Sequence, residues 1–227
     1  MPTPVVFSWS AGKDSAYALW TLRQDPTYEV RALLTTLTEG YDRVSISGVR
    51  RQLVELQAQA LGLPLLEVWI PPGCENAVYE ERLARALAAE SLRGVQHVAF
   101  GDLNLADVRA HREARLAELG KTGLFPLWGR ETATLARGLI ASGFRALLVC
   151  VDPLVLAPSF AGRDFDERLL ADLPPAIDPC GERGEFHTLV WGGPVFQAAI
   201  PCQLGDVVTR DGFVFCDVLV GGASRFP

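Results

Sequence analysis

The sequence predicts an α/β fold with a parallel twisted sheet, followed by a second, smaller α+β domain. Short apolar runs alternate with helical patterns in the first half of the chain, which is typical of βαβ units with right-handed crossovers. A turn of small and polar residues joins the first apolar run to the first helical pattern. After about Trp128 the pattern changes to Pro-rich segments and longer apolar stretches, which are typical of antiparallel strands.

The first half contains four expected strands, each followed by an expected helix. The strands lie at 5–7, 30–36, 65–70 and 95–100, and the helices at 15–24, 49–61, 75–93 and 105–119. Open parallel sheets bind ligands beyond the carboxyl ends of their strands. We therefore expect the turn after the first strand and Gly101-Asp102 after the fourth to open onto one crevice.

The second half is expected to form a separate, smaller unit. A helix is predicted at 132–141 and a strand at 145–151, before a Pro-rich span at 153–179. Two apolar-rich segments, 189–200 and 207–220, are expected to supply antiparallel strands. We place the first domain at 1–128 and a substrate-binding domain at 129–227, with a small-molecule site in the cleft between them.

Composition and charge favour a globular protein of the cytoplasm. Hydrophobic residues make up 49% of the 227 positions, and the net charge is −6. The arginines are scattered, so no basic stripe indicates a nucleic-acid partner. We expect neither a secretory signal nor a membrane span, because no apolar run is long enough. The five cysteines lie far apart without a C-x-x-C pair, so we expect reduced thiols.

The segment Ser-Trp-Ser-Ala-Gly-Lys-Asp-Ser at 8–15 is the most informative motif. In this motif a strand is followed by small residues and the start of a helix. Several backbone N–H groups at the helix start lack partners, and the positive end of the helix dipole lies there, so the turn suits a phosphate. The chain has only two lysines, Lys13 and Lys121, so a lysine here indicates a use for a compact charge. The residues expected to bind the phosphate-bearing cofactor are Ser8, Ser10, Ala11, Gly12, Lys13, Asp14 and Ser15.

This turn is not a Walker A loop. Phe7 and Asp14 stand where that motif needs Gly and Ser or Thr. Asp14 would be repelled by a polyphosphate unless it binds the accompanying Mg²⁺ or caps the helix, and we favour the Mg²⁺ role. The structural alternative for the whole turn is an ordinary Ser-capped helix start with an exposed lysine.

The motif at 9–15 resembles the Ser-Gly-Gly-Lys-Asp-Ser signature of the PP-loop ATP pyrophosphatases, with Ala11 where that signature often has Gly. The resemblance implies the fold of this superfamily, the adenine nucleotide α-hydrolase type. It also implies cleavage of ATP between the α and β phosphates. Adenine contacts are implied near the end of the second strand, here around Leu34 and Thr35.

Two further regions extend the resemblance to the diphthine–ammonia ligase family over nearly the whole chain. They are Phe-Gly-Asp-Leu at 100–103 with Phe-Pro-Leu-Trp at 125–128, and above all Asp-Pro-Cys-Gly-Glu-Arg-Gly-Glu-Phe-His-Thr at 178–188. The Phe-His version of the last motif is similar to the bacterial branch, in which His is expected where this chain has Ser47. The resemblance implies ATP and Mg²⁺ as cofactors, with ammonium and a carboxylate acceptor as partners.

The implied reaction is an AMP-forming amide ligation. The acceptor carboxylate is adenylated, pyrophosphate leaves, and ammonia or an amine displaces AMP. In archaeal and eukaryotic members the acceptor is a modified histidine of a translation elongation factor. In a bacterial source it would be another carboxylate, either protein-borne or a small molecule such as a cofactor precursor. Glu185 or His187 would take the proton from the amine.

The other candidate residues have structural alternatives. Asp102 either binds Mg²⁺ or orients the nucleophile, or it caps the next helix. Arg109 and Arg112 share a helix face with Glu113. They either present guanidinium groups to an anion or form solvent-exposed ion pairs along the helix. The expected substrate-binding residues are Arg109, Arg112, Glu182 and Thr188, and the expected catalytic residues are Lys13, Asp102, Glu185 and His187.

The last motif runs from a Gly-punctuated loop into an expected strand. Alternation in that strand would put Glu185 and His187 on one face, where a carboxylate and an imidazole can pass a proton. The alternative is a structural turn in which Glu185 pairs with an arginine.

Other functions remain alternatives at this point. A non-catalytic ATP-binding sensor would share the fold and release no AMP, and a related PP-loop enzyme would act on a cofactor precursor. Sulfur insertion into tRNA is disfavoured by the cysteine spacing and the negative charge. The sequence leaves the oligomeric state open, a homodimer included.

Overall fold

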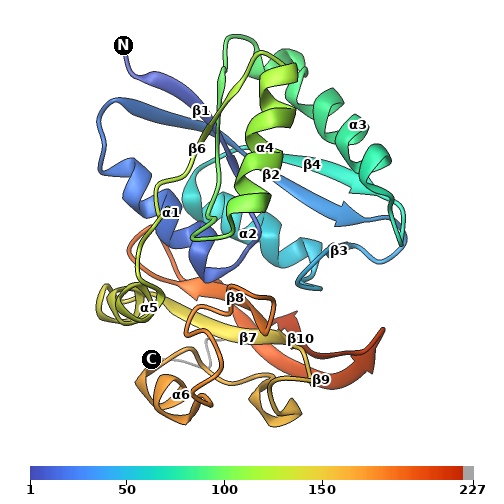
Figure 1. Ribbon diagram of the computed structural model, residues 1–227, viewed down its shortest axis with the longest axis vertical. Coiled ribbons are helices and arrows are strands. Elements are labelled where there is room, and N and C mark those ends of the chain that lie inside the picture. Colours follow the sequence, from blue (N-terminus) through green and yellow to red (C-terminus); the bar gives the residue numbers. More distant parts are fainter. Residues whose placement is uncertain (222–227) are drawn as a thin grey trace.

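Two β-sheets organise the computed structural model, which describes residues 1–221 (Figure 1). Sheet A has the strand order β3-β2-β1-β5-β6, with β4 paired to β2. All its pairs are parallel except β2 with β3. Its strands are β1 (Thr3–Ser8), β2 (Tyr28–Thr38), β3 (Arg43–Val44), β4 (Leu65–Ile70), β5 (His97–Ala99) and β6 (Thr122–Leu124).

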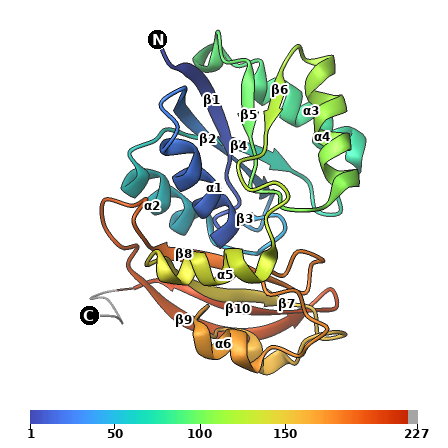
Figure 2. The same ribbon diagram turned by 60° about the vertical axis from the view of Figure 1, so that its left-hand side comes forward.

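Helices cover both faces of sheet A, as the apolar residues of β1 require. Val5 and Phe7 are fully buried in one core cluster, and Val6 between them is fully buried in a second cluster on the opposite face. In Figure 2, α1 and α2 lie on one side of the sheet and α3 and α4 on the other. These helices are α1 (Lys13–Arg23), α2 (Arg51–Leu61), α3 (Asn76–Leu87) and α4 (Ala106–Glu118).

Sheet B belongs to the second half of the chain and is antiparallel, with the order β8-β7-β10-β9. Its strands are β7 (Arg145–Val151), β8 (Phe186–Gly192), β9 (Cys202–Arg210) and β10 (Phe213–Val220), accompanied by helices α5 (Thr132–Ala141) and α6 (Glu167–Asp172). The core cluster that contains Phe7 continues into sheet B through Leu148 and Val190. The two units therefore share one hydrophobic core rather than being joined by a free linker.

The predicted fold class, a parallel α/β sheet with a smaller α+β unit, is confirmed. Segments 65–70, 132–141 and 145–151 have the predicted type and bounds. The expected helix at 75–93 was too long, since α3 ends at Leu87 and a short 3-10 helix (Glu90–Leu92) follows. The segment 207–220 is two strands, because Asp211 and Gly212 both have positive φ and form the tight turn between β9 and β10.

The segment expected at 189–200 also differs from the structure. Strand β8 begins three residues earlier, at Phe186, and ends at Gly192. Gly193 follows with a φ of 148°, and its backbone packs so closely on Phe144 that a Cβ would lie 2.7 Å from that ring. None of the helices described, up to residue 221, is long and apolar enough to cross a membrane.

Candidate active site

The turn at 8–15 connects β1 to α1 in an uncommon backbone conformation. Ala11 has φ 66°, in the left-handed region that favours glycine, and its side chain is fully buried. The helix N-cap is Gly12, which makes no side-chain cap. The Ser-capped start considered from the sequence is therefore not what the chain adopts. Instead the Ser15 hydroxyl donates to the Gly12 carbonyl, and the Ser10 hydroxyl lies 3.1 Å from that of Ser15.

Lys13 is a buried cation rather than a mobile surface group. Its side chain is 2% exposed, and its ammonium donates to the Asp14 carboxylate at 2.8 Å and to the carbonyl of Cys180. The rings of Phe165 and Phe186 each lie with their centroids 5.4 Å from Nζ. Burial is the largest single effect and lowers the pKa of Lys13, but Asp14, Cys180 and Glu182 together raise it by more, so the pKa lies above its usual value and the group stays charged.

Strand β8 of sheet B lies directly against this turn. The Lys13 amide donates to the Thr188 hydroxyl at 3.0 Å, and the Val190 amide donates to the Ala11 carbonyl at 2.9 Å. A Cβ on Gly12 would lie 3.1 Å from the Thr188 carbonyl oxygen, so the two backbones approach closely. The first half of the chain thus relies on the second half to hold its own turn.

Gln57 completes this contact from α2. Its side chain is fully buried, and its amide donates to the carbonyls of Ala11 at 3.1 Å and Val190 at 2.6 Å. Its carbonyl accepts from the indole N–H of Trp9 at 2.8 Å. Gln57 is not among the residues predicted from the sequence. The available signal is a polar side chain on the apolar face of α2, otherwise formed by Leu53, Val54, Ala58 and Leu61.

Gly101 lets the second motif approach the same helix start. A Cβ at Gly101 would lie 2.9 Å from the Ser15 backbone nitrogen, so only glycine fits there without movement. The next residue, Asp102, pairs with Arg112 of α4 at 2.7 Å, and the Arg112 guanidinium lies 4.5 Å from the Phe100 ring centroid. Asp102 is therefore held at the end of β5, next to the beginning of α1.

A cavity of about 960 Å³ lies between the two halves and brings these motifs together. Its lining has two chemically different parts, called here the charged end and the uncharged end: one of charged and titratable groups, and one of hydroxyl, amide and apolar side chains. The charged end is lined by Lys13, Asp14, Asp102, Arg112, Glu182, Arg183 and His187, together with Ser8, Ser10, Gly12, Ser15 and Thr188. The uncharged end includes Thr36, Thr38, Ser45, Ser47, Asn76 and Tyr79.

The loop at 178–185 spans the cavity from the second half to the first. The Glu182 carboxylate accepts from the backbone amides of Leu103 at 3.3 Å and Asn104 at 3.0 Å, directly after Asp102. Burial, and secondarily the charge of Asp14, raise the pKa of Glu182. This carboxylate links the two distant motifs in addition to lining the cavity.

Comparison with known proteins agrees with this arrangement. The diphthamide synthase N-terminal domain matches residues 3–121, which contain the 8–15 turn and Asp102, and the diphthamide synthase C-terminal domain matches residues 131–213. The chain belongs to the diphthamide synthase family. The resemblance stated from the motifs is thereby confirmed.

Curated relatives that match this chain carry the name diphthine–ammonia ligase, those of Mus musculus, Danio rerio and Schizosaccharomyces pombe among them. The protein of Mus musculus is 25% identical over 95% of this chain and 89% of its own length. That of Danio rerio is 28% identical over 78% of this chain and 74% of its own length. That of Schizosaccharomyces pombe is 26% identical over 91% of this chain, but the match spans only 37% of the yeast protein.

His187 follows the loop in this diphthamide synthase fold and lines the cavity. Burial, and then the positive charge of Lys13, lower the pKa of His187 to about 4. Its imidazole is therefore neutral near pH 7, and the low pKa makes it a weak base.

Glu185 lies elsewhere. Its carboxylate accepts from the backbone amides of Asp178 at 3.1 Å and Arg183 at 2.9 Å, its side chain is 5% exposed, and it is not among the cavity-lining residues. Glu185 precedes β8 instead of sharing a strand face with His187. Its partners are backbone amides rather than the arginine considered from the sequence.

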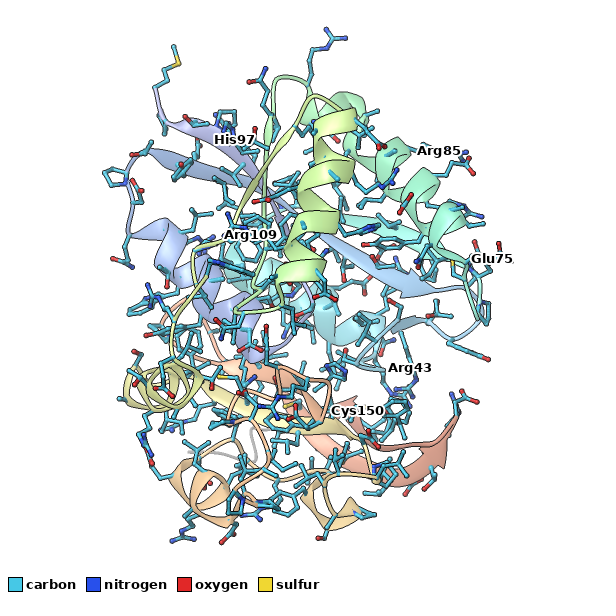
Figure 3. All side chains as sticks on the ribbon, viewed as in Figure 1. Arg43, Glu75, Arg85, His97, Arg109 and Cys150 are labelled. Atoms are coloured by element: carbon cyan, nitrogen blue, oxygen red, sulfur yellow. The ribbon has the colours of Figure 1, made fainter. Side chains whose placement is uncertain are left out.

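The two arginines of α4 are separated by the fold. Arg109 pairs with Glu113 at 2.8 Å and stacks between Phe125 and Trp128, with ring centroids 4.7 and 4.6 Å from its guanidinium carbon, outside the cavity lining. Figure 3 shows Arg109 beside α4, away from the sheet B strands. Arg112, one turn along, lines the cavity.

The expected adenine contacts are also only partly brought to the cavity. Leu34 lines it, whereas Thr35 is 1% exposed and is absent from the lining. Side chains alternate along a strand, so Thr36 and Thr38 share the cavity face of β2 with Leu34. Ala11 is likewise buried below the cavity rather than lining it, and faces Gln57 and β8 through its backbone.

Proposed function

We propose that this protein is an ATP-dependent, AMP-forming ligase that adenylates a carboxylate acceptor and transfers ammonia or an amine to it. One observation carries the proposal: the 8–15 turn, Asp102 with Arg112, and His187 of the second half line a single cavity. Family membership supports it, because the relatives' name describes a ligase that joins ammonia to diphthine. The chain spans just over a third of the yeast relative, so activity and substrates are proposed rather than carried over.

The β and γ phosphates of ATP would bind at the N-terminus of α1. The helix dipole, the backbone amides and the buried ammonium of Lys13 all favour negative charge there. The uncharged end of the cavity, next to Leu34 and Thr36, would take the nucleoside. The α-phosphorus then lies between the two ends and faces the second half of the chain.

Oxygen donors suited to Mg²⁺ are present beside this phosphate site. The Asp14 side chain is 28% exposed at the cavity, and the hydroxyls of Ser10 and Ser15 line it nearby. Among the described residues, no group of three or more His, Cys, Asp or Glu side chains could hold a metal ion. Mg²⁺ would therefore be held by Asp14 together with ATP phosphates and water, and would neutralise phosphate charge.

The chemistry proceeds in two displacements. An oxygen of the acceptor carboxylate attacks the α-phosphorus, the bond to the β-phosphate oxygen breaks, and pyrophosphate leaves. Ammonia then attacks the acyl carbon of the acyl-adenylate, the bond to AMP breaks, and the amine loses a proton. Lys13 stabilises charge on the leaving pyrophosphate, and Arg112 orients the acceptor carboxylate.

We assign the proton transfer to His187. Its imidazole lines the cavity and is neutral near pH 7, as a base must be. The Glu185 carboxylate is already bound by two backbone amides outside the lining, which supports a structural task for it. The acceptor, either protein-borne or a small molecule, and the cytoplasmic location remain predictions. The oligomeric state remains open, a homodimer included.

Product analysis tests the proposal. Protein would be incubated with α-labelled ATP, Mg²⁺, ammonium and a cell extract, either complete or freed of macromolecules. AMP from the wild type and not from Lys13→Met supports the ligase. Lys121→Met is the matched control, because the Lys121 ammonium binds the Val95 carbonyl and neither residue lines the cavity. ADP as the product contradicts it. ATP binding without turnover in either extract would support the sensor alternative.

A further inference from the structure

One wall of the cavity is the 43–50 loop, which runs from β3 to the start of α2. Val44, Ser45, Ile46 and Ser47 of this loop line the uncharged end. Backbone hydrogen bonds close the loop on itself, from Val44 to Val49 at 2.8 Å and from Gly48 to Val44 at 2.9 Å. The loop is therefore compact, and its position depends on what holds its two ends.

Both ends are held by one carboxylate from the other half of the chain. Asp217 of β10 accepts from Arg43 at 2.9 Å and from Arg50 Nε at 3.0 Å. Arg43 also donates to the Gly48 carbonyl at 2.8 Å, so the same guanidinium fixes the interior of the loop. Figure 3 shows Arg43 below sheet A, facing β9 and β10. Hydrogen bonds between charged groups are among the stronger side-chain contacts.

The geometry of β10 directs Asp217 toward the loop. Val214, Cys216 and Val218 are buried in sheet B, so Phe215 and Asp217 lie on the alternate face. The register between β9 and β10 shifts between Cys216 and Val218, so Asp217 lies at an irregularity of the ladder. The Phe215 ring fits against Gly48, where φ is 71° and a Cβ would lie 3.0 Å from the ring.

The loop carries a buried polar group at the cavity wall, without a partner in the described part of the chain. Ser47 is 5% exposed at the cavity wall, and its hydroxyl has no hydrogen-bond partner among residues 1–221. A buried hydroxyl without a partner is costly, and a ligand atom in the cavity would satisfy it. Asp217 is not among the lining residues, so any effect it has on a ligand must act through this loop.

We propose that Asp217 is a positioning residue of the nucleotide site: by holding Arg43 and Arg50 together, it fixes the loop that carries Ser47 against the uncharged part of the ligand. The identity of the ligand as ATP rests on the proposed function. Without the carboxylate, two guanidinium groups at the ends of one loop repel each other, and the wall loses its fixed position. Ligand binding would then have to include the cost of ordering the loop.

The test is the Kd for Mg²⁺-ATP, measured by calorimetry at a temperature where every variant is folded by circular dichroism. We expect Asp217→Asn to weaken binding about tenfold, because the loop must be ordered on binding. Asp217→Glu, which keeps the charge, should recover most of the loss. Asp206→Asn removes an exposed carboxylate from the neighbouring strand and should leave the Kd unchanged.

A second variant keeps the test valid if Asp217→Asn does not fold. The double change Arg43→Gln with Arg50→Gln should weaken binding by the same factor, and adding Asp217→Asn to it should have no further effect. A purely structural role would lower the melting temperature of Asp217→Asn while leaving the Kd of the folded protein unchanged, and this result would overturn the inference.

The outcomes also separate this inference from the proposed function. Wild-type protein that forms AMP while Asp217→Asn binds ATP normally would overturn only the positioning role. Wild-type protein that binds ATP without forming AMP, together with a tenfold weaker Kd for Asp217→Asn, would overturn only the ligase. Wild-type protein that fails to bind ATP would overturn both.

Discussion

The backbone amide of Lys13 donates to the side-chain hydroxyl of Thr188, across 175 positions of the sequence. This bond pairs an N–H at the first turn of α1 with the edge of sheet B, while the Lys13 ammonium reaches the carbonyl of Cys180. The turn that is expected to bind phosphate is therefore held in place by both halves of the chain. The two units must fold together for either to present the site.

Gln57→Leu should destabilise the protein by about 2–3 kcal/mol. The change leaves the indole N–H of Trp9 without its partner and removes two donors from the carbonyls of Ala11 and Val190, all in a fully buried place. Urea unfolding measures the free energy of unfolding. Gln59→Leu on the exposed side of the same helix is the control, and equal effects of the two changes would contradict the bridging role.

Ala11→Gly should stabilise the protein by about 0.5–1 kcal/mol. The left-handed φ of 66° costs an alanine roughly 1–2 kcal/mol, and only part of the relief is offset by the greater freedom of glycine in the unfolded chain. Thermal unfolding would show the gain as a higher melting temperature. Ala11→Val should act in the opposite direction, and a higher melting temperature for the valine variant would refute this explanation.

The 8–15 turn could be predicted from the sequence because all its elements are local: an apolar strand, small residues and a helix start. The parallel sheet followed from the same alternation. The task of Glu185 could not be predicted, since its partners are backbone amides whose positions depend on the 178–185 loop. Gln57 was missed for a different reason, because one of its partners, Val190, lies 133 positions away in the sequence.

Arg112→Gln and Arg109→Gln should change different properties of the protein, although the two residues share a helix face. Arg112 lines the cavity and pairs with Asp102, so its loss should lower kcat/KM for AMP formation by about 10- to 100-fold. Arg109 stacks on Phe125 and Trp128 outside the lining, and its loss should act on stability instead. Steady-state kinetics of both variants decide this, and a larger kinetic effect at Arg109 would reverse the assignment.

The low pKa of His187 predicts that the free energy of unfolding depends on pH. Its folded-state pKa of about 4 lies below the ordinary value, so the unfolded chain binds more protons between the two values. The contribution of neutral His187 is fully present above about pH 6.5 and decreases as the pH falls toward 4, by about 3 kcal/mol in all. Urea unfolding at pH 7 and pH 5 should show a smaller loss of stability in His187→Gln than in the wild type. Parallel losses would contradict a buried neutral imidazole.

The most direct test of a single ATP site built from both halves is a crystal structure with α,β-methylene-ATP and Mg²⁺. We predict that the β and γ phosphates lie at the N-terminus of α1 beside Lys13, and that the α-phosphate faces His187 across the cavity. Phosphates bound away from the 8–15 turn, or an α-phosphate turned away from β8, would contradict it.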